Sequence, residues 1–195
     1  MSLDHSTTPR RTTLSAFLAT GVCSLVLVFS GCSDRGGARY TITPQKDDSG
    51  GNLLRYQAQC KGEVPATGRS FKVTVLIWAP HSSEWAYKNT ALKDVSMLLL
   101  TTDGPAWASE ELEILPDHAA TIRGLGRVGS QEVSTAGGSK TASVFELTVN
   151  PVVFSRFTGA RSARFRIGTS EFDLDEDQLQ GIAQLLNRLN KPPEG

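Results

Sequence analysis

The sequence lacks an excess of charge of either sign. Its 20 lysine and arginine residues balance 20 aspartate and glutamate residues, so the formal net charge at pH 7 is zero. Because nucleic-acid binding rests on a basic surface, we expect no nucleic-acid partner. The composition, with 39% hydrophobic residues, 18 glycines and 9 prolines in 195 residues, excludes a collagen, a long coiled coil, a polytopic membrane protein and a wholly disordered chain.

Residues suited to metal binding are scarce, with three histidines and three cysteines in the chain. His81 and Glu84 lie three positions apart, but apart from His5 the only further histidine is His118. A zinc site needs three or four protein ligands. We therefore expect loop residues here and no metal or other cofactor.

An alternating acidic run, Asp173-x-Asp175-x-Asp177, imitates the start of a calcium-binding loop. Such a loop needs glycine at its sixth position and glutamate at its twelfth, where this chain has Gln178 and Gln184. Carboxylates are also favourable at the positive end of a helix. We interpret the run as an acidic helix start.

Sequence motifs of nucleophilic catalysis are missing too. The chain has no Gly-x-Ser-x-Gly and no Ser-x-x-Lys, and the run at 137–141 lacks the spacing of a phosphate-binding loop. Four carboxylates could act in acid–base chemistry, but the sequence does not place them as a pair: Asp94, Asp103, Glu110 and Glu111. We favour a non-catalytic protein, and the enzyme alternative stays open.

The N-terminal segment is the most informative part of the chain. Arg10 and Arg11 precede an apolar stretch, 14–29, that ends in the small residues Ser30 and Gly31. This is the layout of a secretory signal, and its apolar part of about 16 residues is short for a membrane span of about 20.

The residues Phe29-Ser30-Gly31-Cys32 resemble the lipobox of bacterial lipoproteins, with Phe29 where that family usually has leucine. The resemblance implies cleavage between Gly31 and Cys32, and acyl chains on Cys32 that anchor the protein in the membrane. An uncleaved N-terminal anchor helix is the alternative. If the lipobox is cleaved, residues 1–31 are a signal peptide, and 32–39 are the lipidated cysteine and a tether that spans at most about 25 Å.

Both alternatives place the rest of the chain outside the cytoplasm, because the two arginines hold the N-terminus inside. In lipoprotein terms, Ser33 after the lipidated cysteine favours the outer membrane over the inner membrane. Cys23 lies within the signal, so Cys60 is the only other thiol of the exported part. Cys60 can be buried, paired between molecules or reactive; its apolar strand face favours a small buried hydrophobe.

We expect residues 40–190 to form a single α+β domain with a mostly antiparallel sheet, which could be arranged like a sandwich. Residues 191–195 would form a tail. Alternation of apolar and polar residues predicts most strands. The run at 95–101 fits a central strand or a buried helix, and 80–93 a loop or a short helix. The predicted strands are 40–43, 53–60, 70–79, 95–101, 112–115, 120–125, 128–134, 141–149 and 162–168.

The last 45 residues carry the clearest local signals. Asn150 and Pro151 predict the start of a short helix over 151–158. A two-residue II′ turn at 168–169 would pair strand residues of matching character across a hairpin: Arg166 with Glu171, Phe165 with Phe172 and Arg164 with Asp173. A capping box of Asp175 and Gln178 predicts a final helix over 175–190, packed on the sheet through Leu179, Ile182, Leu186 and Leu189.

Two clusters could form binding surfaces. Arg156, Arg161, Arg164 and Arg166 could bind an anion or lipid headgroup, although pairing with the following acids in a salt-bridge ladder is favoured. A groove for a glycan, peptide or partner could be lined by Trp78, Trp85, Trp107 and Tyr87, and core packing is the favoured alternative.

From these features we expect a lipid-anchored protein of the cell envelope that acts as a non-catalytic binding or assembly module near the membrane. Its partners would be the membrane, through the acyl chains on Cys32, and an envelope protein. Two alternatives remain. One is a small periplasmic hydrolase that uses scattered carboxylates or His81 and His118, and the other is a carrier of an apolar ligand between sheet and helix.

Overall fold

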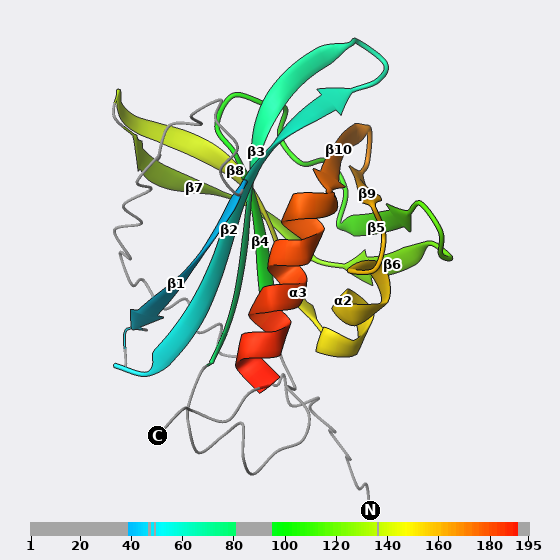
Figure 1. Ribbon diagram of the computed structural model, residues 1–195. Helices are drawn as coiled ribbons and strands as arrows, with labels where there is room; N and C mark the ends of the chain where they lie inside the picture. Colours follow the sequence, from blue (N-terminus) through cyan, green and yellow to red (C-terminus); the bar gives the residue numbers. More distant parts are fainter. Residues whose placement is uncertain (1–38, 47, 49, 81–94, 136, 191–195) are drawn as a thin grey trace, which may run out of the picture.

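The computed structural model describes residues 39–46, 48, 50–80, 95–135 and 137–190 (Figure 1). In this part of the chain a strongly bent sheet of ten strands curves around a long C-terminal helix. Every pair of neighbouring strands is antiparallel. The predicted α+β class is therefore confirmed, with a mostly antiparallel sheet, a short helix and a C-terminal helix packed on the sheet.

The sheet runs in the order β6-β5-β9-β10-β2-β3-β4-β8-β7, and β1 pairs with β2 beside this path. The strands are β1 (Tyr40–Lys46), β2 (Asn52–Val64), β3 (Arg69–Pro80), β4 (Val95–Thr101), β5 (Glu111–Pro116), β6 (Ile122–Leu125), β7 (Arg127–Thr135), β8 (Gly138–Val149), β9 (Ser162–Ile167) and β10 (Ser170–Asp175). The helices are α2 (Pro151–Phe157) and α3 (Glu176–Asn190).

The centre of the sheet is the long hairpin of β2 and β3. Its register places Tyr56 opposite Ile77 and continues to Val64 opposite Arg69. Both strands are longer than the apolar alternation predicts, because the backbone ladder continues beyond the alternating residues, as far as Val64 opposite Arg69. Gly68, with φ of 62°, closes the turn between the two strands.

The apolar run at 95–101 is a strand, β4, which settles the choice that periodicity left open. It lies between β3 and β8, and the side chains on both of its faces are covered. Met97 and Leu99 belong to the main core under the helices, whereas Leu98 and Leu100 point to the opposite face. There they form a second cluster, defined here as Leu76, Leu98, Leu100, Val133, Ala142 and Val144.

The two ends of the strand order meet at a single residue, Gly126. It joins β6, which pairs with β5, to β7, which pairs with β8. A Cβ atom on Gly126 would lie 2.5 Å from the ring of Phe145 and 2.7 Å from the carbonyl oxygen of Glu146. Glycine is therefore required where the chain crosses from one end of the sheet to the other.

The predicted start of α2 and the predicted pairing of the β9–β10 hairpin are confirmed. Asn150 Oδ1 accepts a hydrogen bond from Val152 N at 2.9 Å, and Pro151 follows as the first helical residue. In the hairpin each of the three predicted cross-strand pairs is present. Gly168 has φ of 57° while Thr169 does not have a positive φ, which is the pattern of a II′ turn.

Helix α3 begins with the predicted capping box. Gln178 N donates to Asp175 Oδ1 at 3.0 Å, and Asp175 N donates to Gln178 Oε1 at 3.1 Å. The apolar stripe of the helix is buried in the main core, which also holds the aromatic rings of the β9–β10 hairpin and of α2. This stripe consists of Leu179, Ile182, Leu185, Leu186 and Leu189.

Strand β1 meets α3 at Gly181, where a Cβ atom would lie 2.5 Å from Cγ of Tyr40. Gly181→Ala should therefore destabilise the fold, although alanine is better than glycine in a helix by about 1 kcal/mol. In a Tyr40→Ala background the ring is gone, so the same substitution should become stabilising. Thermal unfolding of the unaltered protein, the two single variants and the double variant measures both effects. A destabilising Gly181→Ala in the Tyr40→Ala background would contradict the proposed contact.

Candidate functional site

The most organised group of polar side chains lies on the outer face of β6, β5, β9 and β10. Alternation along these strands directs one set of residues inward, including Leu112, Phe165 and Phe172, which are buried. The other set points outward and carries the charges. Within this set, the charged side chains that contact one another are called the charge ladder: Arg123, Glu113, Arg166, Glu171, Arg164 and Asp173, in the order of their contacts.

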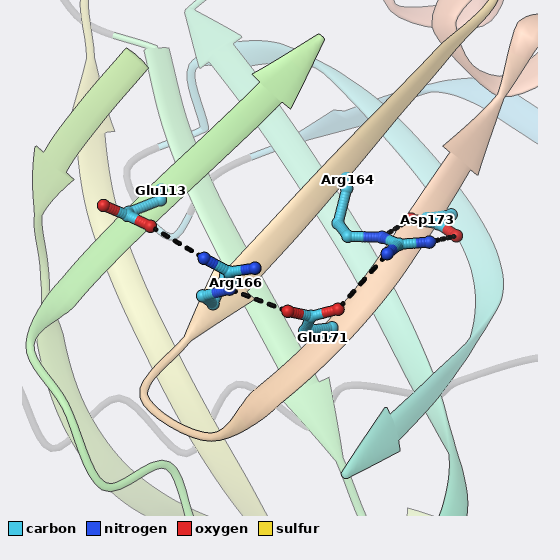
Figure 2. A network of polar contacts seen from close by, with 5 residues as sticks. All are labelled: Glu113, Arg164, Arg166, Glu171 and Asp173. Carbon is cyan, nitrogen blue, oxygen red and sulfur yellow. Dashed lines mark hydrogen bonds and ion pairs between the residues drawn. The ribbon is translucent and has the colours of Figure 1, made fainter. Parts of the chain in front are cut away.

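Arg164 and Asp173 form a pair joined by two hydrogen bonds (Figure 2). Arg164 Nε lies 2.8 Å from Asp173 Oδ1, and Nη2 lies 3.0 Å from Oδ2, so the guanidinium binds both carboxylate oxygens. Arg164 Nη1 also lies 3.4 Å from Glu171 Oε2. This two-pronged geometry is the one in which an arginine–carboxylate pair is most specific.

Arg166 links the hairpin to the neighbouring strand β5. Its Nε lies 2.7 Å from Glu171 Oε1, and its Nη1 lies 3.4 Å from Glu113 Oε2. Glu113 in turn accepts a hydrogen bond from Arg123 Nε at 3.0 Å. The ladder therefore runs across four strands and alternates in sign along its whole length.

The carboxylates raise the pKa values of the arginines that they contact. The hydrogen bond and the negative charge of Asp173 raise the pKa of Arg164, and those of Glu171 raise the pKa of Arg166. Three guanidinium groups meet three carboxylates, so the ladder as a whole is neutral. The salt-bridge alternative thus describes Arg164 and Arg166 better than an anion-binding patch, while Arg156 and Arg161 lie outside the ladder.

Two shallow surface pockets flank the ladder. One, of about 320 Å³, lies between β2 and the β9–β10 hairpin and is lined by Lys61, Glu63, Arg164 and Asp173, among others. The other, of about 270 Å³, lies on the β5–β6 hairpin beside Leu112 and Leu125. Both are open to solvent. Neither lies between the sheet and α3, where the carrier alternative would place its ligand.

The predicted candidate His118 is oriented by its neighbour. His118 Nδ1 donates to Asp117 Oδ1 at 2.8 Å, and Asp117 Oδ2 accepts from the backbone N of Arg161 at 3.3 Å. The hydrogen bond from His118 lowers the pKa of Asp117. A carboxylate that orients an imidazole is also one half of a catalytic triad, but within the described residues no hydroxyl or thiol makes a hydrogen bond to this imidazole.

The two tryptophans of the predicted aromatic groove that the structure describes, Trp78 and Trp107, do not line a common groove. Trp107 is 4% exposed in the main core, where Nε1 donates to Leu99 O at 3.4 Å and the ring meets Phe71 edge-on. Trp78 is half-buried against the second cluster, on the opposite face of the sheet. Trp85 and Tyr87 lie outside the described residues, as do His81, Glu84, Asp94, Gly31 and Cys32.

Cys60 lies on the predicted apolar face of β2 but is half-buried rather than fully buried. The strand that flanks this end of β2, β10, pairs with it only at Gly62 and Glu63, so the cover is incomplete. The thiol approaches Val73 O at 3.6 Å. Loss of hydration raises the pKa of Cys60, which keeps the thiol protonated at neutral pH.

The acidic run does not converge on one point. Asp173 belongs to the ladder, whereas Asp175 caps α3 and binds Arg39 Nη1 through Oδ2 at 2.7 Å. Asp177 lies in the first turn of the helix. The prediction of an acidic helix start is confirmed, and in the described part of the chain no group of three histidine, cysteine or acidic side chains could hold a metal ion.

Glu113, Arg123 and Arg39 make charged contacts that the sequence did not reveal. Glu113 meets Arg166 because β5 pairs with β9, at a separation of more than fifty residues. Arg39 meets Asp175 across an even longer separation. No local pattern signals either contact, since both depend on the strand order.

Arg166→Glu should lower the melting temperature, because it places three carboxylates in contact at positions 113, 166 and 171. Adding Glu171→Arg should restore only part of the loss. The new carboxylate at 166 then meets the new arginine but still faces Glu113, and the new arginine at 171 faces Arg164. Thermal unfolding compares the variants with the unaltered protein, and complete recovery in the double variant would contradict the contacts of Glu113 and Arg164 in the ladder.

The Asp117–His118 pair predicts a local pKa change. His118→Ala removes the main cause of the lowered pKa of Asp117, so that pKa should rise towards its ordinary value. Because the pKa is lowered in the folded state, the pair stabilises the fold above the ordinary carboxyl pKa, and the effect disappears as the pH falls through the lowered one. Carboxyl NMR titration measures the change.

The matched control is Lys140→Ala. Lys140 Nζ donates to Asp103 Oδ1 at 3.1 Å and lowers the pKa of that carboxyl, so its loss should raise the pKa of Asp103 and leave that of Asp117 unchanged. An Asp117 pKa that stays the same after His118→Ala would contradict the assigned contact.

Among the helices that the structure describes, none combines the length and the apolar character needed to cross a membrane. Comparisons of the chain with protein-family models, with curated proteins and with solved structures found no match. The interpretation of the ladder and of the Asp117–His118 pair therefore rests on the contacts of this chain alone.

Proposed function

We propose that this protein is a lipid-anchored cell-envelope protein that acts as a non-catalytic binding or assembly module close to the membrane surface. The observation that carries the proposal is the run Phe29-Ser30-Gly31-Cys32, placed directly after a basic and then an apolar segment. Acyl chains on Cys32 would hold the protein on the membrane, since two or three chains together anchor nearly permanently. Ser33 favours the outer membrane.

The way in which the chain enters the domain supports a location close to the membrane. Arg39 Nη1 binds Asp175 Oδ2, and Tyr40 stacks on Tyr56 and donates from its hydroxyl to Gln184 Oε1 at 2.9 Å. The domain is thus engaged seven residues after Cys32. Seven residues span at most about 25 Å in any conformation, which is less than the diameter of a domain of this size.

The character of the surface supports binding rather than catalysis. The ladder carboxylates Glu113, Glu171 and Asp173 each contact an arginine, so their charges are already used in structural contacts. What remains is a broad, neutral face of alternating charge beside two shallow pockets. Leu125, 75% exposed, adds an apolar side chain at the edge of this face, which suits contact with another envelope protein.

A hydrolase is the second candidate, and one contact favours it. The imidazole of His118 is oriented by Asp117, as it would be in a general base. Under the proposed function this pair is structural. It joins the loop after β5 to the turn before β9 through the bond from Arg161 N to Asp117.

Lipidation can be tested directly in bacteria that express the whole chain and grow on labelled palmitate. The unaltered protein and a Cys23→Ser control should both incorporate the label, and Cys32→Ser should lose it while still being produced. Mass spectrometry should find Cys32 as the first residue of the mature protein. Full labelling of Cys32→Ser, or an intact initiator methionine on a soluble protein, would refute the lipid anchor.

The two candidate functions differ in what they require of the histidines. The double substitution His81→Ala with His118→Ala should leave the pattern of partners crosslinked in intact cells unchanged, because the proposed binding module does not require an imidazole. Circular dichroism should show that the variant folds. Loss of the cellular function in a folded double variant would instead favour the hydrolase.

A further inference from the structure

We draw no further inference here: the strongest candidate, the second cluster on the face of β3, β4, β8 and β7 that is turned away from α3, together with the half-buried Trp78 beside it, is an apolar sheet face for which nothing in the described residues shows what covers it.

Discussion

The fold depends on the way in which Gln178 joins helix α3 to strand β2. Gln178 is 2% exposed, and a buried amide without partners would be costly. Its Oε1 accepts from Asp175 N, its Nε2 donates to Gln59 O at 2.9 Å, and its backbone carbonyl accepts from the hydroxyl of Tyr56 at 3.0 Å. One residue thus closes the capping box and positions the helix on the sheet. Burial raises the pKa of Tyr56, so this hydroxyl remains a donor.

The position of α3 decides how the chain enters the domain. With the helix held on β2, Gly181 leaves room for the ring of Tyr40, and Asp175 has one oxygen for the cap and one for Arg39. The first described residues are therefore tied to the last helix. In the proposed lipoprotein this junction would connect the membrane anchor to the folded domain through Arg39 and Tyr40.

Most of the C-terminal third could be predicted because its signals are local. The residues of the capping box are three positions apart, and the β9–β10 hairpin joins neighbouring strands through a two-residue turn. The candidate site could be predicted only in part. Arg164 and Arg166 with their hairpin partners were expected, whereas Glu113 joins them through the distant pairing of β5 with β9. The sequence could not separate Trp78 from Trp107. Trp78 lies on β3, where alternation does not show on which side of a curved sheet the helices pack, and Trp107 lies between β4 and β5, where no strand alternation applies.

The sequence by itself determined the starts of both helices and the register of the last hairpin, since each follows from residues within a few positions of one another. The proposal of a membrane anchor rests on the sequence alone. Only the tertiary structure decided that the run at 95–101 is a central strand, that one glycine joins the two ends of the strand order, and that the ladder extends across four strands. These features depend on which strands become neighbours. The order of the strands follows from burial of the whole core around α3, so it cannot be predicted from any short stretch of residues.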